Sequence, residues 1–396
     1  MASPQERKSA LRFIVALGVV SLFADMTYEG ARSILGPYLL ELGASASQVG
    51  LIAGVGEMCG ASLRLISGRI ADRTRAYWTI TVVGYFINMA AVPALAFAGN
   101  WQTAALLVIA ERTGKSLRGP ARDVLLSDAA RSVGHGWGFG LHAALDQTGA
   151  VLGPLLIAAA VARTHHFGPA FLPLAIPAGG ALLMLVVART IQPSPEVAAP
   201  SEMERPLPRV FWMYVAAAGL LACGFVDFPL LAYHLQKTAL AQPATIPLLY
   251  AGAMTLNGVT APLFGKLFDR YGIVVLPWGI LISLLALPLG FLGGLGAAIV
   301  AVACWGTGMG AQDATLRSGI AQVVSMNKRG GAFGGFNAVY GVMWFIGSAT
   351  MGLLYDRSIP ALVEFGIATQ FAAAGMFLWL RQRLAVATGR SQEASR

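Results

Sequence analysis

Apolar stretches of about 20 residues recur along the whole chain, each bounded by glycine, proline or a short polar cluster. A helix of that length crosses a bilayer, whereas transmembrane strands would show alternating segments of about ten residues. The pattern therefore predicts an all-α, polytopic membrane protein. We expect twelve spans, near residues 12–39, 46–67, 77–98, 101–122, 136–162, 167–189, 209–235, 245–264, 272–293, 296–323, 331–354 and 359–381.

A proline- and charge-rich segment divides the predicted spans into two groups of six. It predicts an N-terminal bundle over 1–190, a cytoplasmic linker over 191–208 and a C-terminal bundle over 209–396. The halves share motifs in the same order, since GRIADR (68–73) returns as GKLFDR (265–270) and LFAD (22–25) as GFVD (224–227). Duplicated six-helix bundles are typical of secondary transporters, which bind their substrate near the middle of the membrane.

Composition agrees with this class, because 56% of the residues are hydrophobic and only 12% are charged. The net charge of +9 does not indicate nucleic-acid binding, since the basic residues gather on one predicted side of the membrane. By the positive-inside rule we expect a multi-pass protein of the cytoplasmic (inner) membrane with both termini cytoplasmic. The apolar N-terminal stretch is interpreted as the first span rather than a signal peptide. The three cysteines all fall in apolar spans, so no disulfide framework or metal site is expected.

Two motifs identify a family. The Gly-x-x-x-Asp-Arg loop after span 2 (Gly68, Asp72, Arg73) is repeated after span 8 (Gly265, Asp269, Arg270). The chain resembles the major facilitator superfamily, in which this loop is a signature. The resemblance implies that the loop is a latch, here against the start of span 11 near Lys328, which holds the outward-open state. Gly149, Gly153 and Pro154 in span 5 resemble a motif of the proton-coupled exporters in that superfamily, although helix packing alone also explains them.

Span 1 carries three charges, Asp25, Glu29 and Arg32, at i, i+4 and i+7 on one helical face. Each charge would cost roughly 2.5–3.5 kcal/mol if it faced lipid, so we expect them to face a polar interior. One interpretation makes Asp25 a proton carrier lining a cavity. The other is structural, with Arg32 neutralising Glu29 and the three residues fixing span 1 to a neighbour.

Further charges lie inside other predicted spans. His142 and Asp146 are one turn apart in span 5, and an intramembrane aspartate is a candidate proton or substrate group. Arg112 is a candidate anion ligand or counter-ion to Asp25, and we expect no pair with Glu111 because adjacent helical residues point apart. Asp313 and Arg317 satisfy each other in one interpretation. The complete set of candidates for the cavity is Asp25, Glu29, Arg32, Glu57, Arg112, His142, Asp146, Asp227, Asp313 and Arg317.

The sequence thus predicts a proton-coupled secondary transporter, not an enzyme, that exports a small organic solute or drug by proton antiport. Proton-coupled uptake of a small anionic solute, and a lipid-handling or receptor protein on the same scaffold, stay open as alternatives. The expected partners are a small-molecule substrate, protons and the lipid bilayer, with no nucleic acid. We expect a functional monomer without cofactor or metal.

Overall fold

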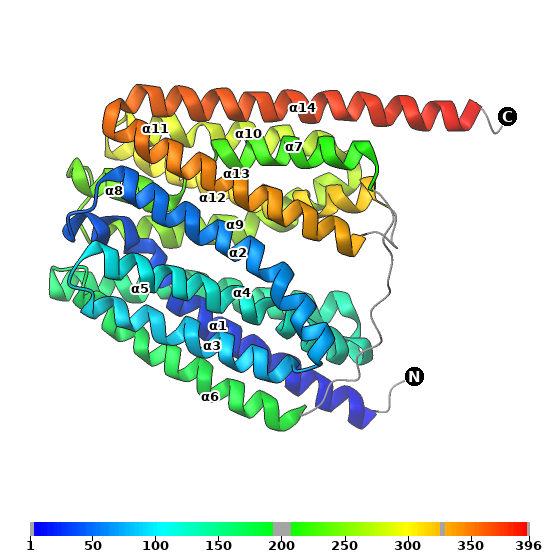
Figure 1. Cartoon of the computed structure of the whole chain (residues 1–396), viewed down its shortest axis with the longest axis horizontal. Coiled ribbons are helices and arrows are strands. Elements are labelled where there is room, and N and C mark those ends of the chain that lie inside the picture. Colours follow the sequence, from blue (N-terminus) through cyan, green and yellow to red (C-terminus); the bar gives the residue numbers. More distant parts are fainter. Residues whose placement is uncertain (1–3, 193–206, 325–328, 394–396) are drawn as a thin grey trace. The chain divides into compact units, whose positions relative to one another are not determined.

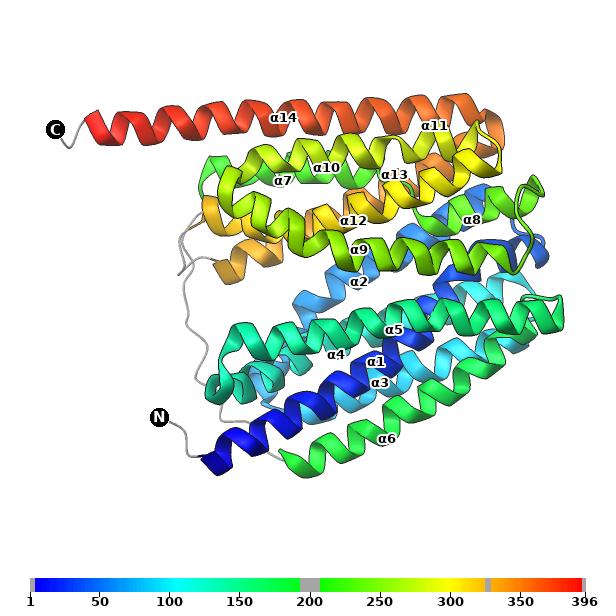
Figure 2. The same cartoon turned by 180° about the vertical axis from the view of Figure 1, so that it is seen from behind.

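The structure is a computed structural model that describes residues 4–192, 207–324 and 329–393. Its regular elements are helices, and no strand occurs in those ranges (Figures 1 and 2). The all-α class is therefore confirmed, while the expected linker falls almost wholly outside the described residues. The helices are α1 (Pro4–Glu41), α2 (Ala46–Thr74), α3 (Tyr77–Ala94), η1 (Leu95–Phe97), α4 (Trp101–Val133), α5 (His135–Thr164), η2 (Pro169–Leu174), α6 (Ala175–Ile191), α7 (Arg209–Gly224), α8 (Phe228–Lys237), α9 (Thr245–Tyr271), η3 (Gly272–Val274), α10 (Val275–Leu284), α11 (Ala286–Phe291), α12 (Leu295–Val323), α13 (Arg329–Arg357) and α14 (Ile359–Glu393).

Ten helical segments among the described residues are long and apolar enough to cross a membrane. One of them, Thr245–Leu292, extends over 48 residues and turns at Gly272, where φ is +66°. Helix α4 is not among the ten because its charged residues lower its hydropathy. The expected number of twelve spans would need α4 to be counted and the long segment to be divided at Gly272, so it stays a prediction.

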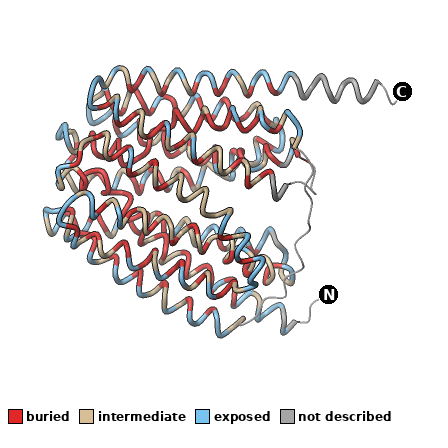
Figure 3. The backbone as a smooth tube through the Cα atoms, viewed as in Figure 1, coloured by how far each residue is buried: buried red, intermediate tan, exposed pale blue. Residues whose placement is uncertain are grey.

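The described residues form two compact units. The first consists of residues 1–201 and 228–254, and the second of residues 202–227 and 255–396. In the first unit α1 packs against α5, α6 and α8, while α4 packs against α2 and α3. In the second unit α7 packs against α13 and α14, and α12 against α10 and α11. Buried and exposed residues alternate along many of the helices, whereas α8 is buried over Phe228–Leu235 (Figure 3).

Local sequence explains where several helices begin. Ser45 caps α2, because its hydroxyl accepts from the Gln48 amide while the Gln48 side chain accepts from the Ser45 amide. Asn100 caps α4 by accepting from the amide of Thr103 at 2.8 Å. These caps fix the first turns of two helices that carry candidate site residues.

The span expected over 209–235 contains a break in the structure. Helix α7 ends at Gly224, Phe225 is extended (φ −87°, ψ 115°), and α8 begins at Phe228. Two side chains donate hydrogen bonds to backbone carbonyl groups at the break. Gln370 Nε2 donates to Gly224 O at 2.8 Å, and Trp305 Nε1 donates to Val226 O at 2.8 Å. Broken helices at membrane depth are stable where protein groups satisfy the freed backbone in this way. The expected span lies within the candidate membrane span Arg209–Lys237, and the break inside it was not predicted because its partners are distant in the sequence.

Candidate functional site

Helix α1 carries a buried polar face. Ser21, Asp25, Glu29 and Arg32 follow one another at intervals of three or four residues, which places them on one side of the helix. Asp25 is 5% exposed, Glu29 6% and Arg32 8%. The three charges of span 1 therefore lie inside the first unit.

The glycines of the span 5 motif bring α5 against this helix. A Cβ atom at Gly149 would overlap the carbonyl oxygen of Leu22, and one at Gly153 would overlap that of Met26. Asp25 lies between these two contact points along α1. The packing interpretation of Gly149 and Gly153 is thus supported, and the close approach also holds Asp146 beside α1.

Asp25 lies in a mixed electrostatic environment. The Tyr28 hydroxyl donates to its Oδ2 atom at 3.3 Å. Asp146 of α5 repels the Asp25 carboxylate, and Lys115 and Arg118 attract it. The Oδ1 atom of Asp146 is buried without a hydrogen-bond partner in the described part of the chain. Two carboxylates from α1 and α5 thus share one polar region of the first unit.

Glu57 of α2 lies between two guanidinium groups. Its Oε1 atom is 3.4 Å from Arg32 Nη2 of α1 and 3.5 Å from Arg112 Nη1 of α4. Gly56 makes room for this arrangement, because a Cβ atom there would lie 3.1 Å from Arg112 Cγ. Arg112, predicted as a counter-ion to Asp25, is instead in contact with Glu57.

Arg112 also contacts its neighbour in the chain, contrary to expectation. Its Nε atom lies 3.3 Å from Glu111 Oε2, and Asn88 Nδ2 of α3 donates to Glu111 Oε1 at 2.8 Å. The prediction that adjacent helical residues could not pair was wrong, because the long arginine side chain bends back along the helix toward the fixed carboxylate.

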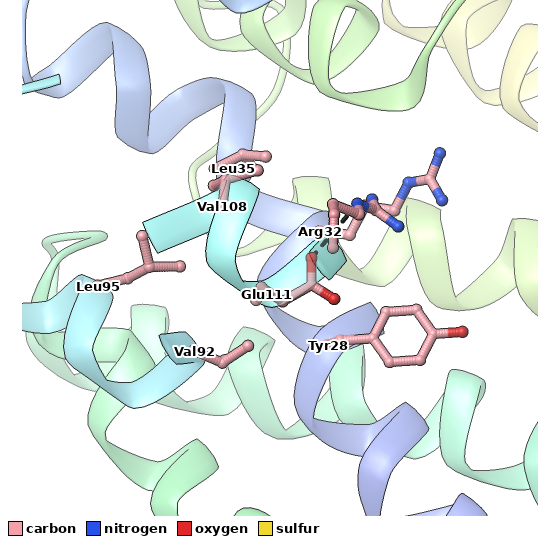
Figure 4. A pocket seen from close by; sticks show the side chains of 9 residues that line it. Tyr28, Arg32, Leu35, Val92, Leu95, Val108 and Glu111 are labelled. Carbon is pink, nitrogen blue, oxygen red and sulfur yellow. Dashed lines mark ion pairs between the residues drawn. The ribbon is translucent and has the colours of Figure 1, made fainter. Parts of the chain in front are cut away.

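A small cavity opens beside these groups (Figure 4). It measures about 20 Å³, which is room for a group the size of a water molecule. Polar side chains from α1 and α4 form one part of its wall, and apolar side chains from α1, α3, η1 and α4 form the rest. The lining residues are Tyr28, Ala31, Arg32, Leu35, Val92, Leu95, Val108, Glu111 and Arg112.

The basic residues after Arg112 were interpreted as markers of membrane orientation, but the structure buries Arg118 and half-buries Lys115. Lys115 Nζ lies 3.4 Å from the centre of the Tyr28 ring, and Arg118 lies 4.1 Å above the Tyr85 ring while only 2% exposed. Their spacing of three residues from Arg112 through Lys115 to Arg118 is the signal that could have placed them on one helical face.

His142 belongs to a hydrogen-bonded group nearer the N-terminus of α1. Its Nε2 atom lies 3.3 Å from Ser21 Oγ, which accepts from Arg122 Nη1 at 3.1 Å. Arg122 in turn forms an ion pair with Asp123 at 2.9 Å. Ser21 therefore links α1 with α4 and α5 one turn away from Asp25.

Glu29 receives its partner from a distant part of the sequence. The hydroxyl of Tyr250 in α9 donates to Glu29 Oε2, and Tyr250 is fully buried against Phe228 of α8, with ring centres 4.4 Å apart. Residues 228–254 belong to the first unit. No pattern in the sequence indicates this contact, because the two residues lie in different predicted bundles.

The acidic residues of the second unit have different surroundings. Asp227 is 2% exposed, and its Oδ2 atom accepts from Trp344 Nε1 at 3.0 Å and from the Ser348 hydroxyl. Asp313 and Arg317 of α12 are exposed within this unit, and Asp313 accepts from Asn257 at 2.9 Å. Asp227 thus repeats Asp25 in sequence position but accepts from neutral donors.

The loop motif contacts α3 and α4 in the described part of the chain. Asp72 accepts from the Tyr77 hydroxyl at 3.3 Å, and a Cβ atom at Gly68 would lie 3.6 Å from Pro120. Arg73 lies in the last turn of α2, which ends at Thr74, and Arg75 follows in the left-handed conformation (φ +54°). In the second copy, Asp269 and Arg270 lie in the last turn of α9, and Gly265 has open space around it. The latch stays a prediction, and Lys328 lies outside the described residues.

The chain is similar to several proteins over nearly its full length. It is 41% identical over 386 residues to an uncharacterized protein of Mycobacterium tuberculosis (strain ATCC 25618 / H37Rv), which covers 94% of each chain. It is also 29% identical over 143 residues to an uncharacterized MFS-type transporter of Methanocaldococcus jannaschii, and this match covers 36% of each chain.

Solved structures of transporters share the fold. The nucleoside transporter NupG matches with a TM-score of 0.72 and 12% identity, covering 92% of this chain and 99% of NupG. A peptide transporter POT in complex with sulfate matches with a TM-score of 0.74 and 14% identity, covering 95% and 94%. The family model of the Major Facilitator Superfamily matches residues 17–348. The chain therefore belongs to the Major Facilitator Superfamily.

Proposed function

We propose that the chain is a proton-coupled secondary transporter that exports a small organic solute by proton antiport. The observation that carries the proposal is a pair of carboxylates inside the first unit, Asp25 on α1, which is 5% exposed, and Asp146 on α5, whose Oδ1 atom is buried. Gly149 and Gly153 bring the two helices close together. A structural role alone does not account for two acids that repel each other there, because their repulsion opposes folding.

A proton shared by the two acids would remove their repulsion. Tyr28 stays as a donor to Asp25, and Lys115 lies beyond the Tyr28 ring as a counter-charge. The Ser21, His142 and Arg122 group lies one turn closer to the predicted cytoplasmic end of α1 and is a route by which protons leave. If substrate binding changes which of Asp25 and Asp146 is charged, the flux of substrate is coupled to the flux of protons.

Export is favoured by the span 5 motif, which resembles that of proton-coupled exporters and packs against the backbone on both sides of Asp25. We place both termini on the cytoplasmic side of the inner membrane and propose that a single copy transports. The structurally similar nucleoside and peptide transporters carry polar solutes, which supports a polar substrate rather than a lipid.

Proteoliposomes containing a pH-sensitive dye test the proposal. With an acidic lumen and a transported compound added outside, exchange should carry protons out of the vesicles and make the lumen more alkaline. Candidate probes are nucleosides, dipeptides, short-chain carboxylates and lipophilic cations. Asp25→Asn should abolish the coupled proton flux while the protein stays folded, as judged by its melting temperature.

Glu364→Gln is the matched control, because Glu364 is an exposed carboxylate near the start of α14. It should leave the proton flux unchanged. Unaltered proton-driven transport in Asp25→Asn and in Asp146→Asn would remove both residues from the mechanism. Proton entry together with substrate, instead of exchange against it, would replace export by uptake.

A further inference from the structure

We propose that Arg32 and Arg112 form a binding site for a small organic anion, and that Glu57 occupies this site as an internal substitute for the carboxylate of the ligand. The proposal rests on the transport function given above and names the chemical class of its substrate.

The two guanidinium groups converge on one oxygen atom. Arg32 Nη2 and Arg112 Nη1 lie 3.4 and 3.5 Å from the same Oε1 atom of Glu57. Charge-assisted hydrogen bonds between such groups are about 2.7–2.9 Å long. Glu57 is therefore attracted by both groups without a close bidentate bond to either, and a ligand able to approach closely with two oxygens would gain from both.

The other acids nearby have partners of their own. Tyr250 donates to Glu29, and Asn88 donates to Glu111 through a hydrogen bond of 2.8 Å. Among the described residues, Glu57 contacts only the two guanidinium groups. Glu57 is thus the acid whose departure would break no further hydrogen bond.

Glu57 is more exposed than the two arginines, as its replacement by a ligand requires. The side chain of Glu57 is 29% exposed, whereas those of Arg32 and Arg112 are 8% and 11% exposed. Glu57 is able to turn toward its exposed side, while the arginines stay buried and charged. An incoming anion that replaces Glu57 keeps a negative charge beside the two largely buried guanidinium groups, so their desolvation stays compensated.

The cavity next to the arginines indicates the rest of the ligand. Its apolar wall is formed by the side chains of Ala31, Leu35, Val92, Leu95 and Val108. A volume of about 20 Å³ holds the end of a short alkyl chain, such as the terminal methyl group of butyrate. We infer a carboxylate that carries a short apolar substituent, and place its charged end between the arginines.

Isothermal titration of the detergent-purified chain with butyrate, without any gradient, tests the site. Wild type should bind weakly, because Glu57 competes for the arginines. Glu57→Gln should tighten the dissociation constant by about tenfold or more, since a fraction of competent site of about one in ten reduces apparent affinity by that factor. Arg112→Lys, which keeps the charge but loses the planar fork, should abolish binding while the melting temperature shows a folded protein.

Glu111→Gln separates displacement from a general change of charge. This variant removes an equal charge, that of Glu111, which contacts Arg112 at 3.3 Å. Glu111 has no contact with Arg32 among the described contacts. A much smaller gain than in Glu57→Gln supports the proposal. Equal gains in the two variants, or no butyrate binding in Glu57→Gln, would overturn it.

The anion site and the proton coupling are separable by experiment. Butyrate binding that depends on Arg112, together with absent proton-driven flux in vesicles, would keep the anion site and reject the proposed transport mechanism. Proton-driven export of tetraphenylphosphonium without butyrate binding to Glu57→Gln would keep the mechanism and reject the anion site.

Discussion

The ammonium group of Lys115 lies 3.4 Å from the centre of the Tyr28 ring, whose hydroxyl donates to Asp25. One aromatic residue thus stands between a cation of α4 and an acid of α1. A cation above an aromatic face gains about 0.5–2 kcal/mol, with the larger values where water is excluded.

This geometry separates the two roles of Tyr28. Tyr28→Phe keeps the ring below Lys115 and loses only the hydrogen bond, whereas Tyr28→Leu loses both. We expect Tyr28→Leu to reduce the free energy of unfolding by about 1 kcal/mol more than Tyr28→Phe. Thermal unfolding in detergent measures the difference, and equal losses would show that the Lys115 contact adds no stability.

The Gly149 contact predicts a sharp steric effect. Gly149→Ala would place a methyl group on the carbonyl oxygen of Leu22, and we expect a loss of about 1–3 kcal/mol. Gly347→Ala should behave in the same way, because Gly347 of α13 packs onto the carbonyl of Cys223 in α7.

Gly179→Ala is the control for both variants. Gly179 lies in α6 with open space around its Cα, so alanine should be neutral or slightly stabilising in this helix. The yield and melting temperature of the three purified variants are the measurement. A Gly149→Ala protein as stable as Gly179→Ala would mean that α1 and α5 are able to separate without cost.

Asp227 is expected to act mainly through its hydrogen bonds. Asp227→Ala leaves the Trp344 and Ser348 donors without this acceptor, which costs about 1–3 kcal/mol for each buried group. Asp227→Asn retains a carbonyl oxygen and should lose much less. If the two variants unfold at the same temperature, the negative charge itself, and not the acceptor, stabilises the break between α7 and α8.

Tyr250 is predicted to matter because Glu29 is only 6% exposed. Tyr250→Phe removes the hydroxyl that donates to this carboxylate, so the free energy of unfolding should fall by about 1–3 kcal/mol. Tyr271→Phe is the matched control, because Tyr271 is 46% exposed. Equal melting temperatures for the two variants would contradict a stabilising role of the Glu29 contact.

The charges of span 1 show how much of the candidate site the sequence could predict. Their position within an apolar segment was enough to predict that Asp25, Glu29 and Arg32 avoid lipid, because burial follows from the cost of charge in hydrocarbon. Their partners could not be predicted in the same way. Glu57 and Tyr250 come from two other helices, and a contact between helices depends on packing geometry that no local pattern records.

Lys115 and Arg118 show a different limit. Their position near a predicted cytoplasmic end favoured an interpretation as orientation signals, since most basic residues there have that role. The structure buries Arg118 against Tyr85 because Gly84 and Gly114 let α3 and α4 approach closely. A Cβ atom at Gly84 would lie 2.7 Å from the backbone of α4, and one at Gly114 would lie 2.5 Å from the backbone of α3. The close approach was visible only after the helices were paired.

The repulsion between Asp25 and Asp146 predicts an energetic coupling between the two positions. Asp25→Asn or Asp146→Asn alone removes the repulsion, and Asp25→Asn also removes the attraction of Lys115 and Arg118. The change in stability of the double variant should therefore differ from the sum of the single changes by a coupling energy of about 0.5–3 kcal/mol, because both single variants remove the same repulsion. Melting temperatures of the four proteins at alkaline pH measure this cycle. Strict additivity at alkaline pH would mean that the acids do not interact, and the shared proton would then have no physical basis.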